Sequence, residues 1–216
     1  MFNKIKCVIF DLDGVITETS NQHFEAWQAM AQKLGITLEP SFEEQLKGVS
    51  RQASLERILA YGQKAISEED KVRYQAEKNA HYQRLIASFD ERQLFPGVDS
   101  LLSHLKSKGI NIALGSASKN GPTLIRALGI EQAFDYVVDP NTCASKPAPD
   151  IFLDAMKHFN LTPQECLGIE DAQAGVDAIK RAGMVAIGIG DPTQLSQADF
   201  VFPTTEDAAQ WLMSKL

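Results

Sequence analysis

The sequence predicts an α/β fold: a parallel sheet core with helices on both faces, and an all-α cap domain inserted after the first strand. Three observations lead to this prediction. An apolar, strand-forming run stands at 6–10. The stretch from about 18 to 88 has helical periodicity and no convincing strand. From residue 95 onward, short β-rich runs alternate with helix-like segments, which implies right-handed βαβ units and a parallel sheet.

The inserted region begins with a clear change of period. Apolar residues recur every three or four positions between 21 and 34 until Gly35 ends the pattern, which is typical of a helix. Phe24 and Trp27 are assigned to the core of the cap rather than to ligand contacts. Two segments resemble capping boxes, in which an acidic residue follows a serine by three positions: SFEE at 41–44 and SEED at 67–70. Helices are expected at 21–34, 51–61 and 67–87.

The rest of the chain alternates between strands and helices. Strands are expected at 6–10, 111–114, 136–138, 166–169, 185–189 and 200–202. Helices are expected at 98–107, 121–128, 150–159, 173–182 and 205–214. Pro122 suits a helix start, and Gly109, Gly129 and Gly183 stand where helices end. These features predict a Rossmann-like core domain made of residues 1–17 and 89–216, and a helical cap domain of residues 18–88.

Composition excludes several classes of function. The chain is 44% hydrophobic and 23% charged, which is ordinary for a globular protein, and its apolar runs fall short of the ~20 residues that span a bilayer. The N-terminus lacks the pattern of a signal peptide. Three scattered cysteines favour a reducing cytoplasm over a disulfide framework or a zinc site. A net charge of -7 argues against nucleic acid or an anionic membrane as a partner. We therefore expect a cytoplasmic protein, monomeric, that binds a small molecule.

Polar residues gather where the predicted strands end. In open parallel sheets, ligands bind beyond these carboxyl ends. The relevant residues are Asp11 and Asp13 after the first strand, 116–120 after the second, Asp139 and Lys146 after the third, and Glu170 and Asp171 after the fourth. Residues i and i+2 of an extended segment point to the same side, so Asp11 and Asp13 can flank one small group.

Four carboxylates at one edge require a cation. Oxygen ligands without histidine or cysteine favour Mg²⁺, which leaves coordination positions for water and phosphate. Lys146 and the Ser116 hydroxyl, with backbone N–H groups at a helix start, suit a phosphate anion. The set therefore indicates phosphoryl transfer, in which a carboxylate can be the nucleophile.

Each element also has a plain structural interpretation. Two aspartates at a strand end can form a solvated turn, the serines after the second strand and the Glu170–Asp171 pair can cap helices, and Lys146 can lie in a surface turn. His23 can be a helix-surface histidine, as is expected for His81, His104 and His158. The placement of the polar groups after four successive strands favours a shared site.

Four segments resemble the signature motifs of the haloacid dehalogenase superfamily: DLDGVITET, GSASKNG, ASKPAPDIF and GIEDAQAG. The match spans essentially the whole chain, and the insertion is similar to the small α-helical cap of that superfamily. LKGVSR in the cap, His23 and SASKNGP resemble the β-phosphoglucomutase family. That family interconverts β-glucose 1-phosphate and glucose 6-phosphate through a bound 1,6-bisphosphate. Gly115 departs from the alanine expected before SASKNGP.

The resemblance implies a role for each matching residue. Asp11 would be the nucleophile and Asp13 the general acid and base. Mg²⁺ would be held by Asp11, the backbone carbonyl of Asp13, Glu170 and Asp171. Ser116 and Lys146 would bind the transferring phosphoryl group, and Thr19 and His23 would link the cap hinge to Asp13. The remaining substrate-binding residues would be Lys47, Gly48, Val49, Ser50 and Arg51 in the cap and Ala117, Ser118, Lys119 and Asn120 in the core.

Two other functions stay open at this point. A sugar-phosphate phosphatase of the same superfamily would share the core residues, and the cap motif with His23 argues for the mutase instead. A non-catalytic module that binds a phosphorylated ligand is disfavoured by the intact Asp11 nucleophile.

Overall fold

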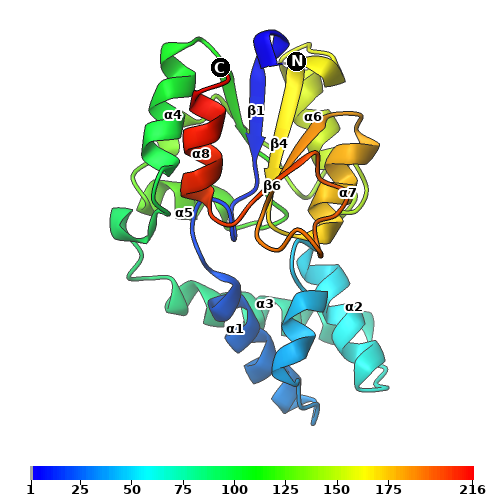
Figure 1. Cartoon of the computed structure of the whole chain (residues 1–216). Helices are drawn as coiled ribbons and strands as arrows, with labels where there is room; N and C mark the ends of the chain where they lie inside the picture. Colours follow the sequence, from blue (N-terminus) through cyan, green and yellow to red (C-terminus); the bar gives the residue numbers. More distant parts are fainter. Residues whose placement is uncertain (1) are drawn as a thin grey trace.

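The core is a six-stranded parallel sheet. The computed structural model describes residues 2–216, and the strand order is β3-β2-β1-β4-β5-β6 (Figure 1). β1 lies at the centre of the sheet and pairs with β2 on one side and β4 on the other. The strands are β1 (Cys7–Phe10), β2 (Asn111–Leu114), β3 (Tyr136–Val137), β4 (Cys166–Glu170), β5 (Val185–Ile189) and β6 (Phe200–Phe202).

Helices cover both faces of this sheet. Because side chains alternate along a strand, Val8 and Phe10 of β1 pack on one face while Cys7 and Ile9 pack on the other. The first face is covered by α4 (Val98–Ser107), α5 (Gly121–Ala127) and α8 (Thr205–Met213). The second face is covered by α6 (Asp150–His158) and α7 (Gln173–Arg181). Short 3₁₀ helices lie at Phe2–Lys4, Glu91–Gln93, Glu131–Ala133 and Pro163–Glu165.

Residues between β1 and α4 form a separate helical layer. It consists of α1 (Ser20–Lys33), the 3₁₀ helix η2 (Pro40–Gln45), α2 (Arg51–Tyr61) and α3 (Glu68–Leu85). Phe24, Trp27, Phe42 and Ile58 belong to an apolar cluster of its own. In Figure 1 these helices lie below the sheet, at the end where β1 finishes. We call this layer the cap.

The predicted fold class is confirmed, and most elements agree with the sequence to within two residues. Gly109, Gly129 and Gly183 follow their helices with φ between +68° and +77°, as the helix-end prediction requires. The Ser67 side chain accepts a hydrogen bond from the Asp70 N–H, which confirms the N-cap half of the capping box predicted at 67–70. The capping box at 41–44 is wrong: Pro40 takes the first position of η2, and Glu39 stands before it. The exact domain limits stay a prediction.

None of the helices described in residues 2–216 is long and apolar enough to cross a membrane.

Candidate active site

The floor of the site is a buried ion-pair cluster at the ends of β1 and β4. Asp11 directly follows β1, and Glu170 ends β4. Lys146, from the loop between β3 and α6, donates to Asp11 Oδ1 at 2.7 Å and to Glu170 Oε1 at 2.6 Å. Glu170 Oε2 accepts two backbone N–H groups, from Asp171 and Ala172. The side chain of Lys146 is 0% exposed, so the cluster is fixed before any ligand binds.

Two glycines make room for these carboxylates. A Cβ at Gly175 would lie 1.8 Å from Glu170 Oε1, and a Cβ at Gly14 would lie 2.0 Å from Asp171 Oδ2. Gly14 also has φ +74°, a conformation that side-chain-bearing residues rarely adopt. Any larger residue at either position would displace a carboxylate.

The carboxylates outnumber the cations on the floor. Burial raises the pKa of Asp11 to about 7, aided by Glu170 and Asp13 and opposed by Lys146. Burial, Glu170 and Asp11 raise the pKa of Asp171 well above its usual value. The pKa of Lys146 is raised because Asp11 and Glu170 outweigh its burial. The lysine therefore stays charged, and its single positive charge does not offset the negative charge that the neighbouring carboxylates carry when they are ionised.

The donor set fits a divalent metal. Asp11, Glu170 and Asp171 each offer an oxygen within 4.8 Å of the others. Lys146 contacts one oxygen of Asp11, whereas the Asp171 carboxylate is free of that lysine. Carboxylate oxygens are the ligands that hard divalent cations prefer, and such a cation would offset the charge excess described above. The predicted contribution of Asp13 came from its backbone carbonyl, which stays a prediction.

Asp13 lies beside the floor, and its carboxylate contacts residues at the start of the cap. Thr19 Oγ1 donates to Asp13 Oδ1, and His23 Nε2 lies 3.8 Å from Asp13 Oδ2. Burial raises the pKa of Asp13 to about 6, although the bond from Thr19 opposes this. A carboxyl group with a pKa near neutrality can both give and take a proton.

Lys78 is a site residue that the sequence did not reveal. It comes from α3, it is 3% exposed, and its Nζ lies 2.6 Å from His23 Nδ1. The rings of His23 and Tyr82 stack with centroids 3.8 Å apart. When Lys78 is protonated it can only donate, so Nδ1 accepts and the proton of the neutral ring sits on Nε2, which faces Asp13. Burial lowers the pKa of His23 well below its usual value, which keeps the ring neutral.

The loop after β2 also borders the site. Ser116 is buried, and its Oγ accepts from the Ser118 N–H at 3.1 Å. Ser118 Oγ accepts from the Asn120 N–H at 3.3 Å, immediately before α5 begins. Gly115 has no room for the expected alanine, because a Cβ there would lie 2.9 Å from Ile9 Cγ2 and 3.1 Å from Ile151 Cγ2. Crowding by these two isoleucines therefore favours glycine at this position.

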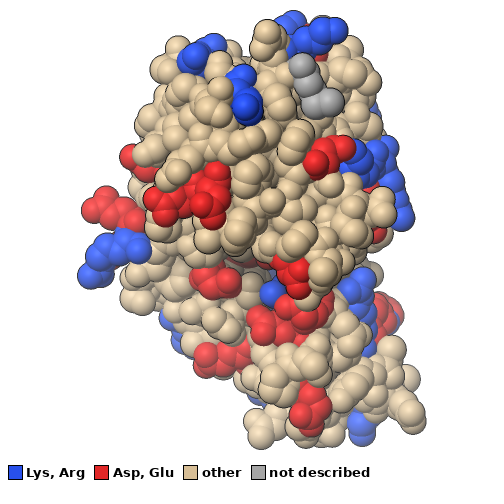
Figure 2. Space-filling model, in the orientation of Figure 1, with Lys and Arg blue, Asp and Glu red and all other residues tan. Residues whose placement is uncertain are grey.

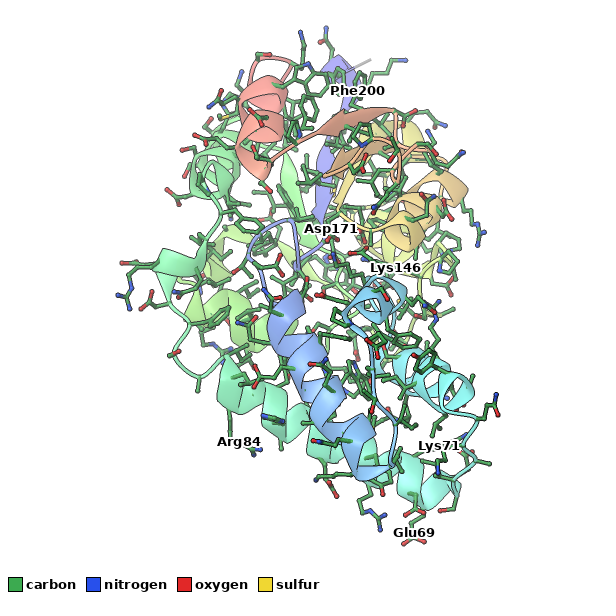
Figure 3. The ribbon with its side chains drawn as sticks, turned by 60° about the horizontal axis from the view of Figure 1, so that its bottom comes forward. Glu69, Lys71, Arg84, Lys146, Asp171 and Phe200 are labelled. Carbon is green, nitrogen blue, oxygen red and sulfur yellow. The ribbon has the colours of Figure 1, made fainter. Side chains whose placement is uncertain are left out.

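The cap presents cations opposite the floor. Arg51 Nη2 donates to Asn79 Oδ1 at 2.7 Å, and Lys47 Nζ contacts Glu44 Oε1 at 2.7 Å. The backbone N–H of Ser50 donates to Ser145 Oγ in the core at 2.9 Å, so the cap contacts the core directly. Figure 3 shows Lys146 and Asp171 at this junction between the core and the cap.

A cleft separates the floor from the cap, and residues of both parts line it. Figure 2 shows acidic side chains around the hollow between the two parts. The predicted residues that line it are Asp11, Asp13, His23, Lys47, Gly48, Val49, Arg51, Ser116, Ala117, Ser118, Lys119 and Asp171. Those behind the lining are Thr19, Ser50, Asn120, Lys146 and Glu170.

Several lining residues were missed from the sequence or assigned elsewhere. Phe24 and Trp27 belong to the cap core, as expected, and they also line the cleft. Their exclusion from ligand contact stays a prediction. The lining residues that were not predicted as site residues are Ser20, Glu43, Leu46, Ser54 and Lys78. The one available signal was the four-residue spacing of Lys78 and Tyr82, which places both on one helix face.

Comparison with known proteins places this chain in a family. Residues 5–183 match the family described as haloacid dehalogenase-like hydrolase. The chain therefore belongs to the haloacid dehalogenase-like hydrolases, as its motifs indicated.

Particular relatives narrow the similarity further. The chain is 44% identical over 206 residues to the β-phosphoglucomutase of Bacillus subtilis, covering 94% of this chain and 91% of that protein. A crystal structure of β-phosphoglucomutase from Clostridium difficile matches with a TM-score of 0.93 and 44% identity over 98% of both chains. A phosphorylated carbohydrates phosphatase of Thermotoga maritima is 30% identical over 187 residues, which cover 85% of this chain and 84% of that protein.

Proposed function

We infer that this chain is a β-phosphoglucomutase. It interconverts β-D-glucose 1-phosphate and glucose 6-phosphate through β-glucose 1,6-bisphosphate and a phosphorylated aspartate. The carrying observation is that one cleft combines a carboxylate floor with Lys146 and a separate set of cations on the cap. A bisphosphate has a phosphate at each end, and this cleft offers cations at both. The 44% identity to the Bacillus subtilis enzyme supports the same activity.

Asp11 is the proposed nucleophile. Lys146 holds Oδ1, which leaves Oδ2 to attack phosphorus. A bond forms between Oδ2 and phosphorus while the bond from phosphorus to the sugar oxygen breaks. Lys146 also faces the phosphoryl oxygens, where its charge lowers the cost of bringing a carboxylate to an anion.

Asp13 is the proposed general acid and base. It protonates the sugar oxygen that leaves phosphorus and takes the proton from the hydroxyl that attacks the phosphorylated aspartate. Thr19 and His23, which contact its carboxylate, are proposed to hold it in position. The sugar turns between the two transfers, so each end meets Asp11 in turn.

The far phosphate is proposed to bind on the cap side. Arg51 can donate two parallel hydrogen bonds to a phosphate, a geometry that lysine does not reproduce. Lys47 and the backbone of Gly48, Val49 and Ser50 would add to this site, and Ala117 through Asn120 would close it from the core. Ser116 would instead bind the transferring phosphoryl group together with Lys146. Lys47 and Arg51 both line the cleft.

The metal that fits the floor is proposed to be Mg²⁺, held by Asp11, Glu170, Asp171 and the Asp13 carbonyl. When bound, it would neutralise charge on the transferring phosphoryl group. Dialysis against EDTA should abolish turnover, and added Mg²⁺ should restore it. Full turnover in excess EDTA would contradict this assignment.

The decisive assay uses β-glucose 1-phosphate, with and without the bisphosphate. Formation of glucose 6-phosphate supports the mutase. Release of inorganic phosphate without isomerisation would support a phosphatase instead. We also propose that the protein is a cytoplasmic monomer that does not bind nucleic acid. Sedimentation at the mass of one chain would support the monomer.

A further inference from the structure

One helix face of the cap contacts both ends of a single amide in the core. Asn120 stands immediately before α5 and is 5% exposed. Its Oδ1 accepts from Gln83 Nε2 at 3.2 Å, and its Nδ2 donates to Asn79 Oδ1 at 2.9 Å. Asn79 and Gln83 are four residues apart on α3, so they lie on the same face of that helix.

The same contacts join Asn120 to the cap cation. Asn79 Oδ1 accepts from Arg51 Nη2 at 2.7 Å as well as from Asn120. One oxygen is thus held between a guanidinium group of the cap and an amide donor of the core. An oxygen of a phosphate anion needs donors of this kind, and the charge makes each bond stronger.

This arrangement depends on which way the Asn120 amide faces. A primary amide has an accepting oxygen at one end and a donating NH₂ group at the other. If the Asn120 amide turned by half a rotation, its Oδ1 would face Asn79. The Asn120 NH₂ group would then no longer stand beside the Arg51 guanidinium as a second donor. The bond from Gln83 Nε2 is made only when Oδ1 faces Gln83.

We propose that Gln83 is a positioning residue for the substrate. It holds the Asn120 amide with its NH₂ group toward Asn79 Oδ1, the oxygen that Arg51 also contacts. A phosphate oxygen that replaces Asn79 Oδ1 would then accept from the core and the cap together, at the end of the substrate farther from Asp11. The inference rests on the proposed function, because it assumes that a sugar carrying a phosphate occupies the cleft.

The sharpest test reverses the polarity of this bond without changing its length. Gln83→Glu places a carboxylate, which only accepts, beside Asn120, so the amide should turn its NH₂ group toward it. Asn120 would then present an oxygen to the phosphate. The KM for glucose 6-phosphate should rise about tenfold or more, the loss of one hydrogen bond to a charged group. The change in kcat should be smaller.

Two further variants separate orientation from charge and from simple loss of the bond. Gln83→Met removes the bond without reversing it, so KM should rise only about two- to threefold. Gln75→Glu adds the same charge to α3 eight residues earlier, about 12 Å along the helix, and should leave KM at the wild-type value. If Gln83→Glu raises KM no more than Gln83→Met or Gln75→Glu does, Gln83 does not set the orientation.

A readout without substrate keeps this test independent of the proposed function. The side-chain NH₂ signal of Asn120, assigned by its loss in Asn120→Ser, should shift in Gln83→Glu and stay in place in Gln75→Glu. An unmoved signal in Gln83→Glu would overturn the inference. A wild-type protein that fails to isomerise glucose phosphates would contradict the proposed function, and the amide signal would still decide the role of Gln83.

Discussion

The floor of the cleft and the cap above it hold their charges in different ways. On the floor, Lys146 contacts two buried carboxylates at 2.7 Å or less. On the cap, Arg51 donates to the neutral amide of Asn79, and Lys47 contacts Glu44, whose side chain is 58% exposed. The floor is therefore fixed by strong mutual pairs, whereas the cap cations hold partners that a phosphate can replace at little cost.

This difference suggests a division of roles. Groups that must not move during phosphoryl transfer are best held by pairs formed before the substrate arrives. Groups that recognise the substrate are best left with exchangeable partners, since the phosphate then gains more than the protein loses. The four predictions that follow separate the two regions, from the largest expected effect to the smallest.

Asp11→Asn should lower turnover by several orders of magnitude, because an amide oxygen is a poor nucleophile toward phosphorus. The amide can still accept from Lys146, so the fold should persist. Steady-state isomerisation and the melting temperature measure the two effects. Substantial isomerisation by a folded Asp11→Asn protein would exclude Asp11 as the nucleophile.

Lys146→Ala should lower kcat by about a thousandfold, since the lysine charge stabilises the phosphoryl group chiefly in the transition state. It should also reduce the free energy of unfolding by about 3–5 kcal/mol, because Asp11 and Glu170 lose their buried partner. Kinetics and denaturant titration check both values. A variant in which only KM changed would show that the lysine binds ground-state substrate alone.

Arg51→Ala should lower kcat/KM for isomerisation by about a hundredfold, which corresponds to about 2.7 kcal/mol for a lost charge-assisted pair. Hydrolysis of a small acyl phosphate, which is too short to reach the cap, should fall much less. Arg51→Lys keeps the charge without the bidentate geometry, so its kcat/KM for isomerisation should lie between those of the wild type and Arg51→Ala. If Arg51→Ala slowed isomerisation and acyl phosphate hydrolysis by the same factor, the cap would not be what favours isomerisation.

Lys78→Met should raise the melting temperature at neutral pH. Burial, with Arg51 nearby, lowers the pKa of Lys78 to about 7 in the folded protein, against about 10.5 when unfolded. The cost of burying the charged lysine is thus fully present below about pH 7 and is relieved as pH rises toward 10.5. The gain from Lys78→Met should shrink over this range, and thermal melting at several pH values measures it. A gain in melting temperature that grew with pH would contradict a lowered pKa of Lys78 in the folded protein.

The sequence predicted the floor far better than the cap. Asp11, Lys146 and Glu170 each follow or end a strand of a parallel sheet, and topology alone brings such positions to one edge. Lys78 and Gln83 lie within a helix that the sequence placed correctly. Which face of that helix meets the core depends on how the cap packs against it, and neither spacing nor composition determines this.

One local error has a similar origin. The serine and acidic residue at 41–44 suggested an N-cap at Ser41, but Pro40, with its fixed φ, begins the turn two residues earlier than that N-cap would. Phe24 and Trp27 show the same limit at the level of the site. Their apolar character correctly predicted the cap core, and the cleft runs along the edge of that core, so both side chains line it as well.

The most direct test of the division between floor and cap is the ratio of glucose 6-phosphate formed to inorganic phosphate released, measured from β-glucose 1-phosphate and the bisphosphate. In Arg51→Ala the ratio should fall by at least about tenfold, because the sugar phosphate binds the cap more weakly while water still reaches the phosphorylated aspartate. In Lys146→Ala both products should slow together, and the ratio should stay near that of the wild type. A ratio that falls in Lys146→Ala and holds in Arg51→Ala would contradict the account.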